Sequence, residues 1–133
     1  MRRLRSYGIA AVVMLALDLP WLGVLAPPLY QNTIAPLLRP HPDLLAAALF
    51  YAIYVAGVNE LVILTFPPGA RLVHVAARGA LFGFVAYATF DLTALSVLKG
   101  WSPLVTVVDM AWGTLLTATV AAVTYRVAGR RAA

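Results

Sequence analysis

Four apolar runs, each long enough to cross a lipid bilayer, constrain this chain more than any other feature. They cover approximately residues 7–26, 44–66, 80–98 and 104–127, and a membrane helix needs about 20 mostly apolar residues. The bilayer interior offers no water to backbone N–H and C=O groups, so such runs cross it as helices. The sequence therefore predicts an all-α, polytopic membrane protein in which residues 1–133 form a single four-helix membrane domain.

Capping residues and prolines predict where these helices begin and end. Asp43 stands before the second run, where its carboxylate can accept hydrogen bonds from the first backbone N–H groups of a helix. Ser102 and Pro103 form an N-cap and a first helical residue for the fourth run. Proline pairs follow the first two runs, and a proline ring interrupts the helical hydrogen-bond ladder. The third helix has an alternative start nearer Arg71.

The composition excludes several classes of protein. Hydrophobic residues make up 62% of the chain and charged residues 11%, against roughly 45–50% and about 25% in soluble domains. The net charge of +5 comes from short basic clusters between apolar runs. A nucleic-acid interface instead gathers its lysine and arginine residues on one water-facing surface. The absence of cysteine excludes disulfides, thiolate metal sites and cysteine nucleophiles. The expected partner is therefore the lipid bilayer and not nucleic acid.

The distribution of lysine and arginine predicts the orientation in the membrane. The N-terminus, the second loop and the C-terminus together hold eight of these residues, and the other two loops hold Arg39 and Lys99. Cytoplasmic loops of membrane proteins are enriched in lysine and arginine. We therefore expect a multi-pass protein with both termini in the cytoplasm.

Four acidic residues lie inside the apolar runs, where charge is expensive. A charged side chain at the centre of a membrane helix costs about 2.5–3.5 kcal/mol on the insertion scale. The rise of about 1.5 Å per residue places Asp18, Asp91 and Asp109 within roughly 5 Å of one another in depth, in the outer half of the membrane. Glu60, which follows Asn59, is expected nearer the cytoplasmic edge.

These acids have no evident cationic partner, because no lysine, arginine or histidine occurs in the central part of any run. A carboxyl group in hydrocarbon favours its neutral form unless a cation or a water-filled cavity supports the charge. The sequence thus predicts a cluster that holds a proton, a cation or a ligand. Hydrogen-bonding side chains within about one helical turn of the aspartates complete the candidate site. They are Tyr87 and Thr93 beside Asp91, Trp112 beside Asp109, and Trp21 beside Asp18.

No motif for a metal or a cofactor accompanies these acids. The chain contains neither a P-loop nor a GxGxxG or HExxH pattern. His41 and His74 are expected outside the predicted spans and are far apart in the sequence. We therefore expect no metal site and no cofactor.

Three functions are compatible with these observations. The first is a small protein that binds or translocates a proton, a cation or a small amphipathic or lipid-like molecule at the aspartates. Since four helices enclose little space, this function predicts a homo-oligomer. The second is an enzyme or accessory subunit in membrane lipid or isoprenoid modification, with Asp91 and Asp109 as acid and base. The third is a membrane scaffold with no site of its own, which positions a cytoplasmic partner through its basic termini while the aspartates only connect helices.

Several motifs together resemble a bacterial family of small membrane proteins known as domain of unknown function twenty-one seventy-seven. The chain is similar to that family over nearly its whole length. The motifs are the stretches 17–23, 49–54, 87–93, 100–103 and 108–113, which read LDLPWLG, LFYAIY, YATFDLT, GWSP and VDMAWG. The resemblance implies a four-helix protein of the bacterial inner membrane with no established activity. It also leads us to expect asparagine at position 94, where this chain has Ala94.

Overall fold

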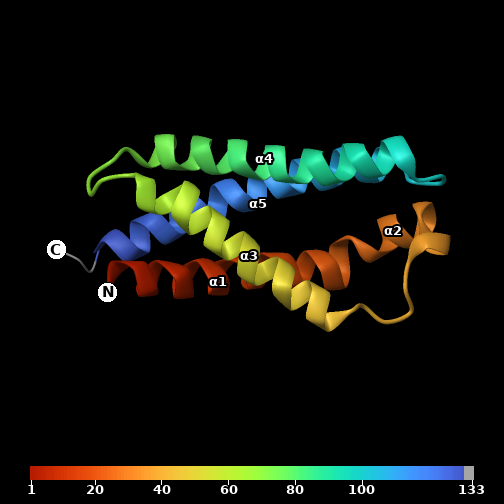
Figure 1. The fold of residues 1–133 in the computed structure, drawn as a ribbon, viewed down its shortest axis with the longest axis horizontal. Coiled ribbons are helices and arrows are strands. Elements are labelled where there is room, and N and C mark those ends of the chain that lie inside the picture. The colour runs from red at the N-terminus through yellow and green to blue at the C-terminus, as the bar shows by residue number, and fades with distance from the viewer. Residues whose placement is uncertain (131–133) are drawn as a thin grey trace.

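The computed structural model describes residues 1–130, and each secondary-structure element in that part of the chain is a helix (Figure 1). Within these residues, four helices are long and apolar enough to cross a membrane. They are Arg2–Leu25, Leu44–Thr65, Leu72–Val97 and Pro103–Ala128. The predicted all-helical fold with four candidate membrane helices is confirmed.

The helices extend further into their basic flanks than predicted. The elements are α1 (Arg2–Pro20), α3 (Leu44–Leu61) with the short helical turn η3 (Ile63–Thr65), α4 (Leu72–Val97) and α5 (Pro103–Arg130). The predicted starts at residues 7 and 80 were too late, and the alternative start next to Arg71 is confirmed. Arginine is a good helix former whose apolar stem can lie along the helix while its charge reaches water. Hydropathy therefore locates the apolar part of a helix and misses its charged end.

Both predicted N-caps are present. The Asp43 carboxylate accepts a hydrogen bond from the backbone N–H of Ala46 at 3.0 Å at the start of α3. The Ser102 hydroxyl accepts one from the N–H of Val105 at 3.2 Å, and Pro103 is the first residue of α5. Each bond satisfies a donor that the helix leaves free, so local sequence alone fixes where these two helices begin.

Pro20 changes the course of the first membrane helix. Proline has no backbone N–H, so it cannot make the regular bond to the carbonyl four residues earlier. The helix continues as a wider turn, η1 (Trp21–Leu25), in which the N–H of Ala26 reaches back five residues to the carbonyl of Trp21 at 2.7 Å. Wide turns of this kind occur as single insertions within α-helices, and this one begins at Trp21. The chain then forms two short helices, α2 (Pro27–Thr33) and η2 (Ala35–Leu37).

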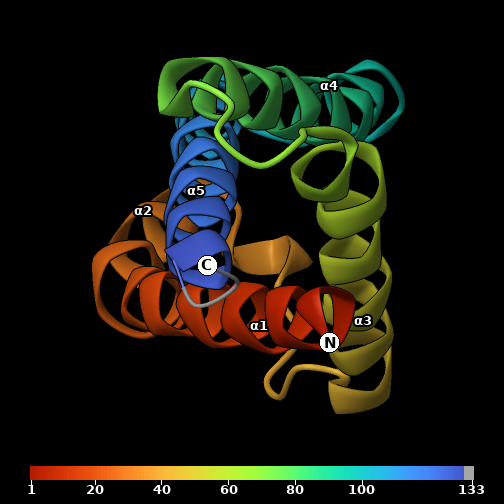
Figure 2. The same ribbon diagram turned by 90° about the vertical axis from the view of Figure 1, so that its left-hand side faces the viewer.

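The two ends of the bundle differ. The start of α1, the end of α5 and the connection between η3 and α4 lie at one end, which we call the terminal end (Figure 1). The short helix α2 and the connection between α4 and α5 lie at the opposite end, the loop end (Figure 1). Seen from the terminal end, α1, α3, α4 and α5 surround a central space (Figure 2). α3 runs obliquely and diverges from α4 towards the loop end (Figures 1 and 2).

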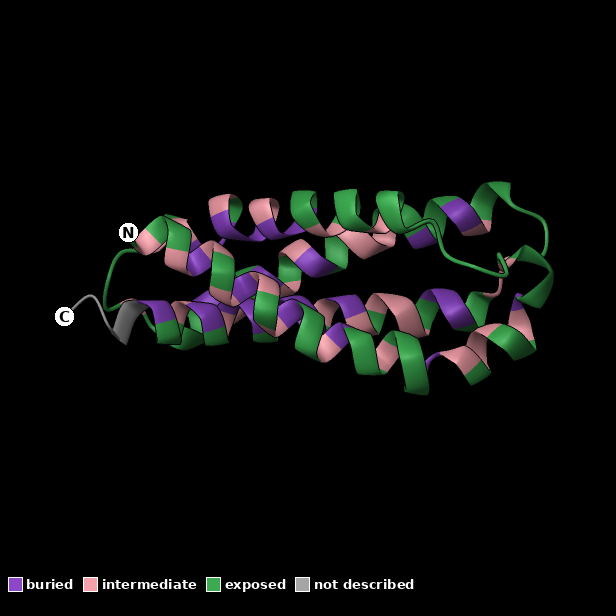
Figure 3. Ribbon diagram, turned by 90° about the horizontal axis from the view of Figure 1, so that it is seen from below, coloured by how far each residue is buried: buried purple, intermediate pink, exposed green. Residues whose placement is uncertain are grey.

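The apolar core fills the terminal half of the bundle. Exposed residues face outwards along the helices, and buried residues face one another (Figure 3). Large apolar side chains such as Leu19, Ile53 and Leu81 are exposed, as expected for helices that contact lipid. The core residues are Ala10, Met14, Tyr54, Val55, Val58, Val62, Ile63, Val75, Leu116, Val120 and Ala121.

Glycines bring α4 and α5 into close contact. A Cβ atom at Gly79 would lie 2.9 Å from the carbonyl oxygen of Thr117, and one at Gly83 would collide with the same threonine. Close approach of backbones over small residues is a common mode of helix association in membranes. Gly113 likewise leaves room for the ring of Tyr87. The paired helices thus hold Tyr87 against the backbone of α5, facing the centre of the bundle.

Candidate functional site

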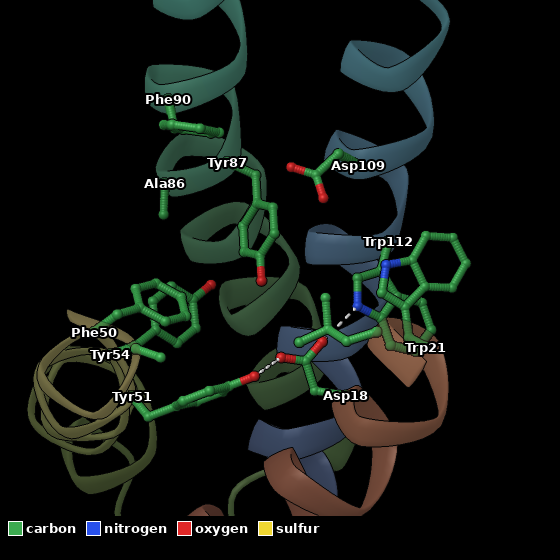
Figure 4. A pocket seen from close by; sticks show the side chains of 12 residues that line it. Asp18, Trp21, Phe50, Tyr51, Tyr54, Ala86, Tyr87, Phe90, Asp109 and Trp112 are labelled. Carbon is green, nitrogen blue, oxygen red and sulfur yellow. Dashed lines mark hydrogen bonds between the residues drawn. The ribbon is translucent and has the colours of Figure 1, made fainter. Parts of the chain in front are cut away.

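Among the acids in the described membrane helices, Asp18 is hydrogen-bonded to the most other helices. It is buried on α1, and its two carboxylate oxygens accept hydrogen bonds from two other helices. The hydroxyl of Tyr51 on α3 donates to Oδ2, and the indole N–H of Trp112 on α5 donates to Oδ1 at 3.1 Å (Figure 4). An ionised carboxylate accepts hydrogen bonds at both oxygens. The three helices therefore meet at one carboxyl group.

Trp21 and Trp112 each lie three residues after an aspartate, and their rings stack on each other. The rings of Trp21 and Trp112 lie 4.6 Å apart between centroids, with 9° between their planes (Figure 4). We predicted that each indole would serve the aspartate on its own helix. This is wrong for Trp112, which donates to Asp18 and not to Asp109, and within residues 1–130 the N–H of Trp21 has no hydrogen-bond partner. The ring of Trp21 lies against that of Trp112 instead.

A cavity of about 400 Å³ opens beside Asp18, between α1, α3, α4 and α5 (Figure 4). Its wall contains seven aromatic residues, two aspartates and three aliphatic residues. We expected four helices to enclose little space, and the oblique course of α3 leaves this cavity within one chain (Figure 1). The lining residues are Asp18, Trp21, Leu22, Ala47, Phe50, Tyr51, Tyr54, Ala86, Tyr87, Phe90, Asp109 and Trp112.

Asp109 borders this cavity and a second, smaller one. The second cavity, of about 270 Å³, lies under α2 at the loop end and is also lined by Tyr30, Phe90 and Trp101. The hydroxyl of Tyr30 donates to Oδ1 of Asp109 across 3.4 Å, a long hydrogen bond. Burial and the neighbouring carboxylate raise the pKa of Tyr30 to about 12, so this hydroxyl keeps its proton at neutral pH. Asp109 thus connects α5 to the segment that covers the loop end.

Asp91 is fully buried on α4, and Asp109 is its acidic neighbour on α5. Neither oxygen of Asp91 has a hydrogen-bond partner among the residues that the structure describes. Ala94 is buried one turn further along the same helix and offers no donor, where the family resemblance led us to expect an amide. Tyr87, the donor predicted for Asp91, turns its ring into the main cavity instead (Figure 4). α4 and α5 therefore bring two carboxyl groups together in the membrane part of the chain.

Two predicted site residues lie away from this cavity. Thr93 is exposed on the outer side of α4. Glu60 lies towards the terminal end, where it accepts hydrogen bonds from Arg3 Nη2 at 3.1 Å and from the hydroxyl of Tyr7 at 2.7 Å. The prediction that the membrane acids lack a cationic partner is therefore wrong for Glu60. Arg3 was overlooked because the helix begins earlier than hydropathy indicated.

Sequence reasoning missed the contribution of α3. Phe50, Tyr51 and Tyr54 all line the cavity, and the hydroxyl of Tyr54 hydrogen-bonds the hydroxyl of Thr117 at 2.7 Å. The available signal was their spacing, because Tyr54 lies four positions after Phe50 and three after Tyr51, and residues at these spacings share one side of a helix. Tyr30 was also not predicted as a site residue, since its partner Asp109 lies 79 positions away.

The described residues offer no metal centre. Among residues 1–130, no group of three or more histidine, cysteine, aspartate or glutamate side chains is arranged to hold a metal ion. His41 and His74 are both exposed, and His74 lies in the first turn of α4. What the site does provide is negative charge and aromatic surface around a cavity.

Four apolar helices of membrane-spanning length around an acid-lined cavity define a small multi-pass membrane protein. The chain belongs to the family of predicted membrane proteins DUF2177, whose sequence profile matches residues 3–126. This confirms the resemblance noted from the sequence motifs. No curated protein and no solved structure matches the chain.

Proposed function

We propose that this protein binds a small amphipathic molecule in the cavity between its four membrane helices. The polar head of the molecule lies at Asp18 and Asp109, and its apolar part lies against the aromatic wall. The observation that carries the proposal is Asp18, a buried acid held from two other helices at the edge of a largely apolar cavity. An acid that only connected helices would need no such space beside it.

We place the protein in the bacterial inner membrane with both termini in the cytoplasm. Eight of the ten lysines and arginines belong to the segments that this orientation leaves in the cytoplasm. The cavity then lies in the outer half of the membrane, nearer the periplasmic side. Because it forms within one chain, an oligomer of this protein would carry one such site in each copy.

Cysteine labelling in liposomes tests the proposal, since the natural chain has no cysteine. Ala86→Cys places a thiol in the cavity wall, and Ala16→Cys places one on the lipid-facing side of α1. A water-soluble methanethiosulfonate reagent should modify the first thiol and leave the second unmodified, because thiols in hydrocarbon do not ionise. Equal absence of labelling at both positions would contradict the proposal.

Protection against labelling tests binding itself. Octanol, octanoate and octylammonium share one apolar chain and differ in the charge of the head. At least one of them should slow modification of Ala86→Cys. Modification of Asn32→Cys, in the exposed part of α2, should keep its rate and so controls for effects on the bilayer or the reagent. If none of the three compounds protects Ala86→Cys, the proposed function is wrong.

A further inference from the structure

We infer that the cavity selects organic cations: an ammonium group lies between Asp18 and Asp109, and an apolar body contacts the aromatic rings. This inference rests on the proposed function and names the chemical class of its ligand. Three independent features of the cavity wall support this inference. They are its acidic residues without basic partners, the neutral donors that hold Asp18, and the arrangement of the aromatic rings.

The first feature is uncompensated negative charge. Asp18 and Asp109 line the cavity, and no lysine, arginine or histidine is among its lining residues. Within the described part of the chain, the salt bridges join Arg3 to Glu60 and Arg39 to Asp43, both outside the cavity. Asp91 adds a further acid behind Asp109. This wall would repel an anionic ligand, and a neutral ligand would leave the charge of the wall unbalanced.

The second feature is that Asp18 is held by neutral donors only. The phenol of Tyr51 and the indole of Trp112 orient both carboxylate oxygens but bring no positive charge. A buried charge without a counter-charge remains costly, and a cationic ligand would supply what the protein does not.

The third feature is the aromatic wall. Phe50, Tyr54, Tyr87 and Phe90 line the side of the cavity formed by α3 and α4, and the stacked pair of Trp21 and Trp112 lines the opposite side (Figure 4). The face of an aromatic ring carries partial negative charge and attracts ammonium groups, most strongly where water is excluded. Aromatic rings around a carboxylate are thus suited to a cation that also has apolar surface.

The same wall is unsuited to a metal cation. Hard cations such as Mg²⁺ and Ca²⁺ bind six or more oxygen ligands, and this cavity offers two carboxylates and three phenols, of which Tyr51 and Tyr54 already share hydrogen bonds with protein groups. An ammonium ion with organic substituents needs fewer oxygen ligands because the rings supply the remaining contacts. The ligand is therefore an organic cation and not a metal ion.

Three probes of similar shape test the inference on the whole protein in lipid nanodiscs. Benzyltrimethylammonium carries the charge, 2,2-dimethylpropylbenzene replaces its nitrogen with carbon, and phenylacetate is an anion. Calorimetry with empty nanodiscs as blank should show that the ammonium compound binds at least about tenfold more tightly than the other two. Equal or tighter binding of the neutral or anionic probe would overturn the inference and leave the proposed function standing. No binding of any probe, together with no protection of Ala86→Cys, would overturn both.

Matched variants locate the binding. Asp18→Asn should weaken benzyltrimethylammonium at least about tenfold and change the neutral probe little. Asp43→Asn is the matched control, because it also removes one negative charge at the loop-end half of the bundle. Position 43 lies outside the cavity, and asparagine can replace aspartate as the N-cap of α3. It should bind all three probes like the natural protein. Equal weakening in both variants would show that overall charge, and not the cavity, attracts the cation.

A second variant keeps the test decisive if Asp18→Asn does not fold. Phe90→Leu removes one ring from the cavity wall and leaves both carboxylates in place. Its ring is largely exposed, so the substitution should be tolerated in the fold. Benzyltrimethylammonium should bind about threefold to tenfold more weakly, as expected for one cation–π contact. Unchanged affinity would contradict the role of the aromatic wall.

Discussion

The indole N–H of Trp112, on α5, donates to the carboxylate of Asp18, on α1, across 94 positions of sequence. The same carboxylate accepts the hydroxyl of Tyr51 from α3. One acid in the hydrocarbon thus joins three of the four membrane helices, and the fourth, α4, supplies Tyr87 to the same cavity. Asp18 therefore both connects the helices and forms part of the candidate site.

Removing the indole donor should destabilise the bundle. Trp112→Phe leaves one oxygen of the buried Asp18 without its hydrogen bond, which costs about 1–3 kcal/mol of unfolding free energy. Reversible unfolding in mixed micelles measures this loss. Trp101→Phe is the matched control, because the indole N–H of Trp101 has no partner within residues 1–130. Equal losses in the two variants would mean that ring volume, and not the hydrogen bond, accounts for the effect.

Adding a methyl group between α4 and α5 should loosen their packing. A Cβ atom at Gly83 would collide with the backbone of Gly113 and the side chain of Thr117. Gly83→Ala should therefore cost about 1–3 kcal/mol in the same unfolding measurement. Gly8→Ala, on α1, meets no atom within 4 Å and should be neutral or slightly stabilising. A neutral Gly83→Ala would contradict the close contact between these helices.

At the terminal end, the buried hydrogen bond should matter more than the exposed ion pair. The hydroxyl of Ser6 donates to the amide oxygen of Asn59, and both residues are buried. Asn59→Ala should cost about 1–3 kcal/mol, because it leaves the hydroxyl without its partner. Arg3→Ala should cost under about 1 kcal/mol, because the side chains of Arg3 and Glu60 are 71% and 39% exposed. The reverse order of these losses would refute this assignment.

Thr93 provides a test of the site's boundary. It was a candidate from its spacing to Asp91, yet it is exposed on α4 and is not part of the cavity wall. Thr93→Val keeps the shape of the side chain and removes its hydroxyl. Binding of benzyltrimethylammonium in nanodiscs should stay within about twofold of the natural protein, since no contact to the cavity is lost. A tenfold change would require a larger site than the one described here.

Patterns along one helix could be predicted from the sequence. Asp43 and Ser102 cap their helices as expected, because a cap depends on residues three positions apart. Hydropathy predicted the four spans. The positions of Asp18 and Asp109 within their spans predicted that the two residues lie at one depth, and both line the same cavity. These features follow from helical geometry and the thickness of the membrane alone.

Contacts between helices could not be predicted in the same way. The hydrogen bond from Tyr51 to Asp18 depends on how α3 crosses α1, and a single sequence contains no record of that angle. Trp21 was assigned to the wrong partner because its ring stacks on Trp112 from another helix, a contact that spacing along one helix does not contain. The ion pair between Arg3 and Glu60 depends on the start of α1 lying beside the end of α3, and the sequence does not contain this antiparallel packing.

The carbon-13 NMR signal of the Asp18 carboxyl group tests the central claim most directly. The chain has four aspartates, so a sample labelled only at aspartate gives four carboxyl signals, and Asp18→Asn identifies one of them. Addition of octylammonium to the protein in nanodiscs should shift the Asp18 signal and leave that of Asp43, outside the cavity, unchanged. An unchanged Asp18 signal under conditions where the amphiphile binds, or an equal shift at Asp43, would contradict a binding site at this carboxylate.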